Sequence, residues 1–171
     1  MSKNKKMEHS RYNIDFISLT RVPRFRDLAV PLITEVSRES STLLHQAVEQ
    51  CARYFQREGY SDWKHYDESD YNSPHVVSYL FTDGNFPHAI GAACFRLREF
   101  RDLPEKIWTM HWVWIHPYAR NKGLLSEHIS QFNAKFGYWY PETPHSKGMT
   151  SFIAKHNIVS PLTHFNLPDH D

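Results

Sequence analysis

A short basic segment, Arg120-Asn121-Lys122-Gly123-Leu124, lies between a strand-like run that ends at Ile115-His116-Pro117 and a helical pattern. A helix that begins directly after such a turn leaves its first backbone N–H groups unpaired, and these groups bind anions together with the helix dipole. Arg120 and Lys122 add positive charge, and Gly123 allows a ligand to approach the backbone closely. The segment therefore predicts a cradle for a phosphate group.

The glycine content of this segment excludes two familiar nucleotide-binding motifs. A Walker loop needs two glycines and a Gly-Lys-Ser/Thr ending, and a dinucleotide fingerprint needs three glycines. The segment has only Gly123. Either another class of phosphate ligand binds here, or the segment is an ordinary basic start of a surface helix.

Histidines are a second chemical feature, because the chain has 12 of them. They form no HExxH motif, and His111 and His116 are five residues apart on a predicted strand, where their side chains point to opposite faces. We therefore expect no metal site. His111 stands among apolar neighbours, and an imidazole is suited to proton transfer at neutral pH. Its alternative role is that of a core histidine hydrogen-bonded to the backbone.

The segment from Tyr60 to Pro74 mixes aromatic and acidic residues and is expected to be a loop. Aromatic faces and carboxylates together favour a cation such as a polyamine, an aminoglycoside or a protein lysine. The candidate residues for binding such an acceptor are Tyr66, Asp67, Glu68 and Asp70. The alternative is a solvated surface loop that buried rings anchor.

Hydrophobic periodicity predicts the elements that position these residues. The N-terminal part is expected to comprise a flexible basic tail, a weak strand, a helix kinked at Pro31 and a longer helix, at 1–12, 13–19, 24–37 and 41–58. In the longer helix, apolar residues recur at three- and four-residue steps. Ser40 or Ser41 can cap its start, and Gly59 can end it.

The C-terminal part is expected to begin with a hairpin, because two strand-like runs flank Asp83-Gly84-Asn85. The next strand is apolar on both faces, which is typical of the middle of a sheet. A helix that ends at Gly137, a short strand and a short last helix follow. The expected ranges are 75–82, 88–99, 107–116, 124–136, 137–140 and 146–156.

The cradle and the order of elements resemble the GCN5-related N-acetyltransferase (GNAT) superfamily. In its motif A, a hydrophobic strand ends in Val-x-Pro and is followed by Arg/Gln-x-x-Gly-x-Gly/Ala and a helix. Here Ile115-His116-Pro117 stands at the strand end, and Arg120, Gly123 and Leu125 fall on the three marked positions. Leu125 departs from the small residue of the motif.

The resemblance covers about residues 76–158 and implies one acetyltransferase-like domain over 13–171. The implied fold is α/β (α+β), with helices on a mixed, mostly antiparallel central sheet. The implied activity is acetyl-CoA-dependent N-acetylation of a primary amine, on a small molecule or on a protein lysine or N-terminus. Transfer would be direct, in a ternary complex.

In GNAT enzymes, acetyl-CoA wedges between the motif A strand and the next strand. The resemblance thus implies acetyl-CoA as cosubstrate and no metal, with the pyrophosphate on the cradle. Backbone amides of the strand would polarise the thioester carbonyl where negative charge develops. The implied cofactor-binding residues are Val113, Trp114, Ile115, Arg120, Asn121, Lys122, Gly123, Leu124 and Leu125.

Deprotonation of the amine needs a base or a water chain. His111 is the first candidate for this base, and Glu142 and Glu105 are the second and third. In the family, a tyrosine of the last helix usually protonates the departing thiolate, and Ile153 stands at that position here. The candidate replacements are His156, Tyr138, Tyr140 or water.

Leu125 and Ile153 favour a rival function, that of a catalytically silent GNAT-fold protein that binds CoA or a protein partner. Cys51 and Cys94 lie in apolar patterns and are expected to be core thiols, which disfavours a cysteine-linked acyl intermediate.

Composition bounds the remaining classes. The chain has 171 residues, of which 40% are hydrophobic and 15% aromatic, as suits one globular domain. Its formal net charge is +1 and it has no basic stripe, so nucleic acid is not an expected partner. Because no 18-residue apolar span occurs, we expect a cytoplasmic protein without a membrane partner. A homodimer is left open.

Overall fold

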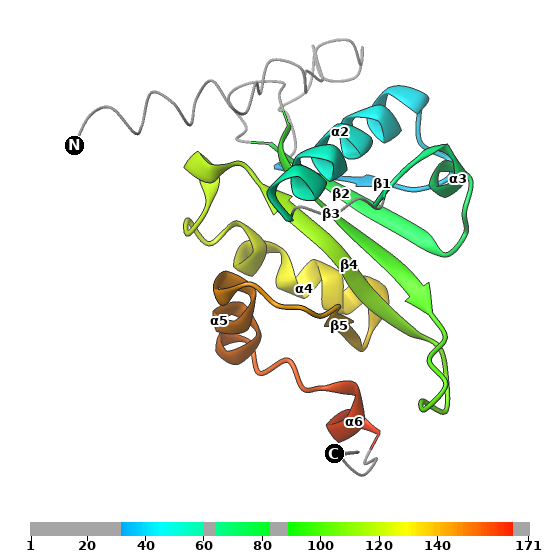
Figure 1. Ribbon diagram of the computed structural model, residues 1–171, viewed down its shortest axis with the longest axis vertical. Coiled ribbons are helices and arrows are strands. Elements are labelled where there is room, and N and C mark those ends of the chain that lie inside the picture. The colour runs from blue at the N-terminus through cyan, green and yellow to red at the C-terminus, as the bar shows by residue number, and fades with distance from the viewer. Residues whose placement is uncertain (1–31, 60–63, 83–88, 166–171) are drawn as a thin grey trace, which may run out of the picture.

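The computed structural model describes residues 32–59, 64–82 and 89–165. They form one five-stranded sheet of order β1-β2-β3-β4-β5, in which β5 is parallel to β4 and all other neighbours are antiparallel (Figure 1). The expected α/β fold with a mixed, mostly antiparallel sheet is confirmed. The strands are β1 (Ile33–Val36), β2 (Val76–Thr82), β3 (Ala89–Arg98), β4 (Ile107–Ile115) and β5 (Trp139–Pro141).

Helices cover both faces of this sheet. α2 (Thr42–Gly59) lies on one face, and α4 (Leu124–Phe136) and α5 (Lys147–Lys155) lie on the other. The remaining helical elements are short: α3 (Glu68–Tyr71), the 3-10 turn η3 (Pro117–Ala119) and α6 (Pro161–His164). The predicted long helix, hairpin strands, central strand, cradle helix and last short helix are all present within a few residues of their expected bounds.

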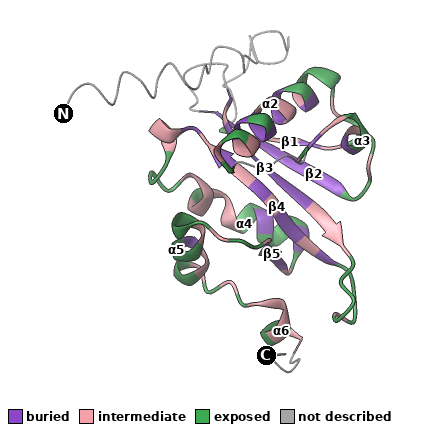
Figure 2. Ribbon diagram, in the orientation of Figure 1, coloured by how far each residue is buried: buried purple, intermediate pink, exposed green. Residues whose placement is uncertain are grey.

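Each face of the sheet has its own apolar cluster. On one face, α2 packs Val48, Cys51 and Ala52 against strand residues such as Trp112 and Trp114. On the other face, residues of α4 and α5 pack against the sheet, as Phe132, Phe136 and Phe152 do against Tyr79 and Phe95. Burial is accordingly concentrated in the central strands and in the helix sides that face them (Figure 2). Both cysteines are buried free thiols, as expected.

Two predictions of secondary structure are wrong. The helix expected over 24–37 is not present at its C-terminal end, where Ile33–Val36 forms β1 and pairs with Phe81 to Ser78 of β2. Sheet pairing of β-branched residues outweighs the local helical pattern there. The segment expected to be a loop contains α3, because Asp67 and Asp70 form a capping box. The expected tail over 1–12 and the strand over 13–19 lie outside the described residues.

A β-bulge interrupts the pairing of β4 with β3. Cys94 pairs with Trp112 and the next residue, Phe95, pairs with Met110, so His111 is the extra residue in β4. The bulge reverses the alternation of side chains: Met110 packs on the α4 face, whereas Trp112 packs on the α2 face. Bulges re-aim side chains and are frequent beside active sites.

The pairing of β4 with β5 is short. It joins Trp108 to Trp139, Thr109 to Tyr140 and Met110 to Pro141, and then Glu142 N–H donates to Met110 O at 3.0 Å. Among the described residues, no strand pairs with this edge of β4 beyond Met110. The C-terminal half of β4 therefore has a free backbone edge that starts at the bulge.

Candidate active site

The backbone groups at the free edge belong to Val113 and Ile115. His116 N–H donates to Ile90 O of the β3 side at 2.8 Å, and backbone groups alternate in direction along a strand. The backbone N–H and C=O groups of Val113 and Ile115 therefore point away from β3, whereas those of Trp114 point towards it. Arg120 Nε donates to Ile115 O at 2.7 Å, so the peptide groups of Val113 are the ones left for a ligand.

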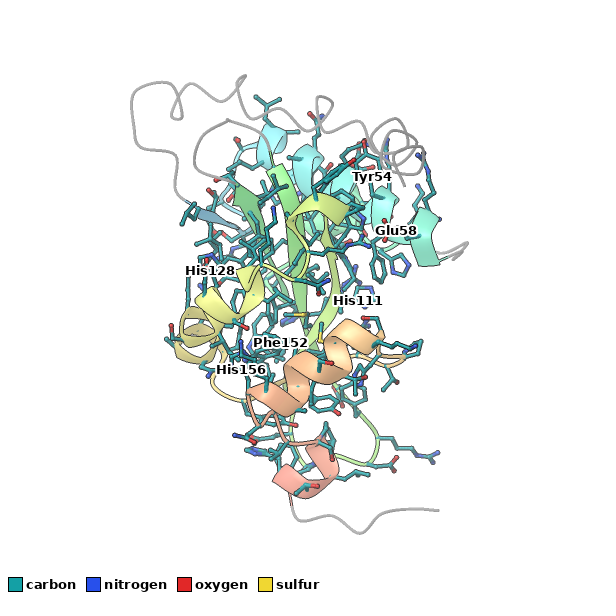
Figure 3. All side chains as sticks on the ribbon, turned by 90° about the vertical axis from the view of Figure 1, so that its left-hand side faces the viewer. Tyr54, Glu58, His111, His128, Phe152 and His156 are labelled. Carbon is teal, nitrogen blue, oxygen red and sulfur yellow. The ribbon has the colours of Figure 1, made fainter. Side chains whose placement is uncertain are left out.

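His111 and Glu142, the two leading candidates for the base, lie together at the start of this edge. His111 Nδ1 is 2.7 Å from Glu142 Oε2. The side chain of His111 is 16% exposed, so the imidazole is partly open to a ligand. In Figure 3, His111 lies between Glu58, which belongs to α2, and Phe152, which belongs to α5.

Two residues that the sequence did not single out complete the carboxylate's environment. Thr109 Oγ1 donates to Glu142 Oε1 at 2.6 Å, and Arg98 Nε donates to the same oxygen at 2.9 Å. Burial raises the pKa of Glu142, but the hydrogen bonds from His111, Thr109 and Arg98 outweigh it and lower the pKa to about 2. Glu142 is thus a fixed anion, which suits it to orient His111 and not to act as the base itself.

His65 is a further residue that lies beside His111, and the sequence had not singled it out. Its ring centroid lies 5.5 Å from that of His111. Its backbone carbonyl accepts hydrogen bonds from Arg96 Nη2 and Trp112 Nε1, at 2.9 and 3.1 Å. The only sequence signal was its place in the acidic aromatic segment.

The cradle has the backbone geometry of an anion site. Gly123 is the N-cap of α4 with φ 84°, and no side chain caps the helix. Asn121 also has positive φ, at 60°. A Cβ at Gly123 would meet only Glu127 Oε1, at 4.0 Å, so the space over the glycine is open. The side chains of Leu124 and Leu125 are partly buried in the apolar cluster beneath α4 and α5. Only the backbone groups of these two residues are therefore available to the cradle.

The positive charge at the cradle is smaller than expected. Arg120 Nη2 lies 2.9 and 2.7 Å from the two carboxylate oxygens of Glu58 at the end of α2, so its charge is largely neutralised. Lys122 is exposed and has no ion pair in the part of the chain that the structure describes. The residues fit a pyrophosphate through backbone N–H groups and Lys122, and a phosphate would compete with Glu58 for Arg120.

Two of the three side chains that are candidates for protonating the thiolate, His156 and Tyr138, lie apart. His156 Nε2 is 2.8 Å from Ser126 Oγ, so His156 joins the end of α5 to the first turn of α4. Tyr138 precedes β5, at the end of the β4–β5 pair opposite to the free edge, where its ring stacks on His164 at 3.7 Å. The structure therefore does not bring Tyr138 to the other site residues, because parallel pairing places it beside the beginning of β4.

The predicted acceptor-binding residues are partly occupied by other contacts. Tyr66 is buried with its hydroxyl 2.7 Å from His45 Nδ1, and Asp70 pairs with Arg96 at 3.0 Å. Asp67 caps α3, and the hydrogen bonds from Ser69 lower its pKa. These contacts fasten the segment to the sheet and α2, as the surface-loop alternative expects. Binding of a cationic acceptor by Asp67 or Glu68 stays a prediction.

The described residues contain no group of three or more histidine, cysteine, aspartate or glutamate side chains placed to hold a metal ion. They also contain no helix long and apolar enough to cross a membrane.

Comparison with known proteins identifies the fold. No protein-family model and no curated protein sequence matches the chain. Solved structures do match: a protein described as a probable acetyltransferase has a TM-score of 0.50 at 16% identity, over 81% of this chain and 98% of that one. An aminoglycoside acetyltransferase from an uncultured soil metagenomic sample has a TM-score of 0.50 at 11% identity, over 81% of this chain and 97% of that one. The chain therefore has the fold of GNAT acetyltransferases, as the resemblance to motif A predicts.

Proposed function

We propose that this protein is an acetyl-CoA-dependent N-acetyltransferase that transfers the acetyl group directly to a primary amine. The observation that carries this proposal is the His111–Glu142 pair at the point where β4 parts from β5. A base and a free backbone edge for the acyl donor would thus lie side by side. Acetyl-CoA, when bound, supplies the activated acyl group.

His111 takes the proton from the acceptor's ammonium in this mechanism. Glu142 holds Nδ1–H by its short hydrogen bond, which leaves the lone pair on Nε2 to accept a proton. The carboxylate then stabilises the imidazolium that forms. The neutral amine attacks the thioester carbonyl, and the Val113 N–H group is the donor that we assign to the oxygen on which charge develops.

His156 returns a proton to the departing thiolate. His156 gives this proton as an imidazolium: Ser126 Oγ accepts the Nε2–H, the Nδ1–H passes to the sulfur, and a neutral imidazole is left that solvent reprotonates. Water is the alternative donor. In either case the CoA leaves as a thiol, and the acetylated amine loses its remaining proton to solvent or base.

A silent CoA-binding protein is the second candidate, because Ile153 replaces the tyrosine expected in the last helix and Glu58 occupies Arg120. Two measurements separate the candidates: calorimetry with acetyl-CoA, and mass spectrometry of an amine panel incubated with acetyl-CoA and the protein. Binding with acetylated products supports the enzyme. Binding without products supports the silent protein, and failure to bind contradicts both.

A further inference from the structure

One polar atom beside the His111–Glu142 pair has no function in the mechanism above. His65 Nε2 is buried and has no hydrogen-bond partner within residues 32–59, 64–82 and 89–165. Buried polar side-chain atoms are nearly always paired, with protein or with a bound molecule. Thr109 and Arg98 donate to Glu142, and Arg96 donates through Nη2 to Asp70 and to the His65 carbonyl, whereas Arg96 Nε has no partner among the described residues.

The position of His65 is firmly fixed. Its carbonyl receives the hydrogen bonds of Arg96 and Trp112 from two adjacent strands. Its ring meets the ring of Phe55 edge to face, with centroids 4.9 Å apart. A ring held in this way presents its free nitrogen in a defined direction, as a residue that orients a ligand must.

His65 offers a neutral hydrogen-bonding group. Burial is the main cause that lowers the pKa of His65, and the charges of His111 and Arg96 lower it further against the opposing charge of Glu142. The imidazole therefore stays uncharged near neutral pH. Its ring centroid is 5.5 Å from that of His111, so one small molecule can contact both rings.

We propose that His65 is a specificity-determining residue that hydrogen-bonds a hydroxyl group on the acceptor whose amine His111 deprotonates. This inference rests on the proposed acetyl transfer. A hydroxyl fits better than a second ammonium, because the carboxylates of Glu142 and Asp70 are already paired with Arg98 and Arg96 and neither is left unpaired to hold a cation. The acceptor class is therefore an amino alcohol and not a diamine.

The test compares ethanolamine with propylamine, which has the same size but lacks the hydroxyl, and with ethylenediamine. We expect the unmodified protein to favour ethanolamine over each of the others at least tenfold in kcat/KM. In His65→Phe the preference over propylamine should disappear, with an unchanged KM for acetyl-CoA. His65→Gln, whose amide can still hydrogen-bond, should keep part of the preference. The control is His75→Phe at an exposed position, which should keep all of it.

The same amines are also titrated into the CoA-loaded protein, with binding followed by NMR. If amines are acetylated but His65→Phe and His65→Gln keep the full hydroxyl preference, His65 is not the specificity residue, although the acetyltransferase function stands. If no amine is acetylated but ethanolamine binding depends on His65, the proposed function fails and the hydroxyl contact stands. If ethanolamine neither binds nor reacts better than propylamine, the inference about His65 is overturned.

Discussion

Nδ1 of His111 cannot serve both of its neighbours at once. It lies 2.7 Å from a Glu142 oxygen, which only accepts, and 3.2 Å from Arg98 Nη2, which only donates. The shorter contact is to the carboxylate, and Arg98 already donates to Glu142 through Nε. A proton on Nδ1 therefore satisfies the most groups, and the tautomer that results is the one a general base needs.

Glu142 gives a prediction about acid stability. Its pKa in the folded protein, about 2, is below its usual value of 4.5, so its ionised form stabilises the fold. That stabilisation is full above about pH 5 and is lost as the pH falls towards 2, with a size of up to about 3 kcal/mol. Glu142→Gln cannot titrate, so the difference in free energy of unfolding between the two proteins should shrink on acidification. Urea denaturation between pH 7 and 3 measures it, and a constant difference would contradict the assignment.

Some residues of the candidate site could be singled out in the sequence, but their contacts could not be predicted. His111 stood out as a titratable residue in an apolar strand, and Glu142 followed the next predicted strand. The partners Arg98 and Thr109 are 44 and 33 residues from Glu142 in the sequence, and His65 is 46 residues from His111. Contacts of this kind depend on strand order, register and the bulge, none of which a local pattern encodes.

Among the elements, the bulge in β4 adds His111 to the candidate site, while the neighbouring residues of β4 keep the faces on which they pack. Deleting His111 would make Met110 and Trp112 consecutive residues opposite Phe95 and Cys94, with each tryptophan and methionine still on its present face. We expect the deletion protein to fold, with about 1–2 kcal/mol lost from broken hydrogen bonds, and to have no transferase activity.

Deletion of Val113 is the matched control for the bulge. It removes a regularly paired residue, so the rest of β4 would change faces and Trp114 would leave its cluster. We expect this protein to lose its cooperative thermal transition by circular dichroism. If the two deletions were equally harmful, the bulge would be part of what holds the sheet together.

The cradle gives a prediction with its own control at the other end of α4. Gly123 and Gly137 flank the helix, and both have positive φ, at 84° and 64°. Valine at either position should cost about 1–3 kcal/mol of stability through backbone strain. Only Gly123→Val should also weaken CoA binding, by at least about tenfold or 1.4 kcal/mol, measured by calorimetry. Equal CoA affinity in the two variants would show that the pyrophosphate does not bind at this turn.

Most elements could be predicted because their patterns are strong and local. The helix from Thr42 to Gly59 repeats apolar residues at helical steps, and β4 has apolar residues on both faces. The missed elements are short: β1 exists through its pairing with β2, α3 through a capping box between Asp67 and Asp70, and α6 has only four residues. Propensity has little weight where four residues form an element.

At the scale of the whole molecule, the Glu58–Arg120 ion pair joins the end of α2 to the cradle across 62 residues of sequence. Because the pair is partly exposed, its own contribution to stability is small, but it engages the charge that a pyrophosphate would use. Glu58→Gln should therefore tighten CoA binding about 3- to 10-fold. The control is Glu49→Gln, which removes a carboxylate of the same helix that pairs with Arg53 and accepts a hydrogen bond from Tyr71. Equal affinities by calorimetry would show that Arg120 has no part in binding.

The central claim is that the His111–Glu142 pair, placed where β4 parts from β5, deprotonates an amine for acetyl transfer. Its most direct test is the rate of acetylated amine formation by the unmodified protein and by His111→Gln, followed by mass spectrometry at saturating acetyl-CoA. We predict turnover by the unmodified protein, a roughly 100-fold lower kcat in the variant and nearly equal affinity for CoA. A folded His111→Gln protein that acetylates its amine at the normal rate would contradict the claim.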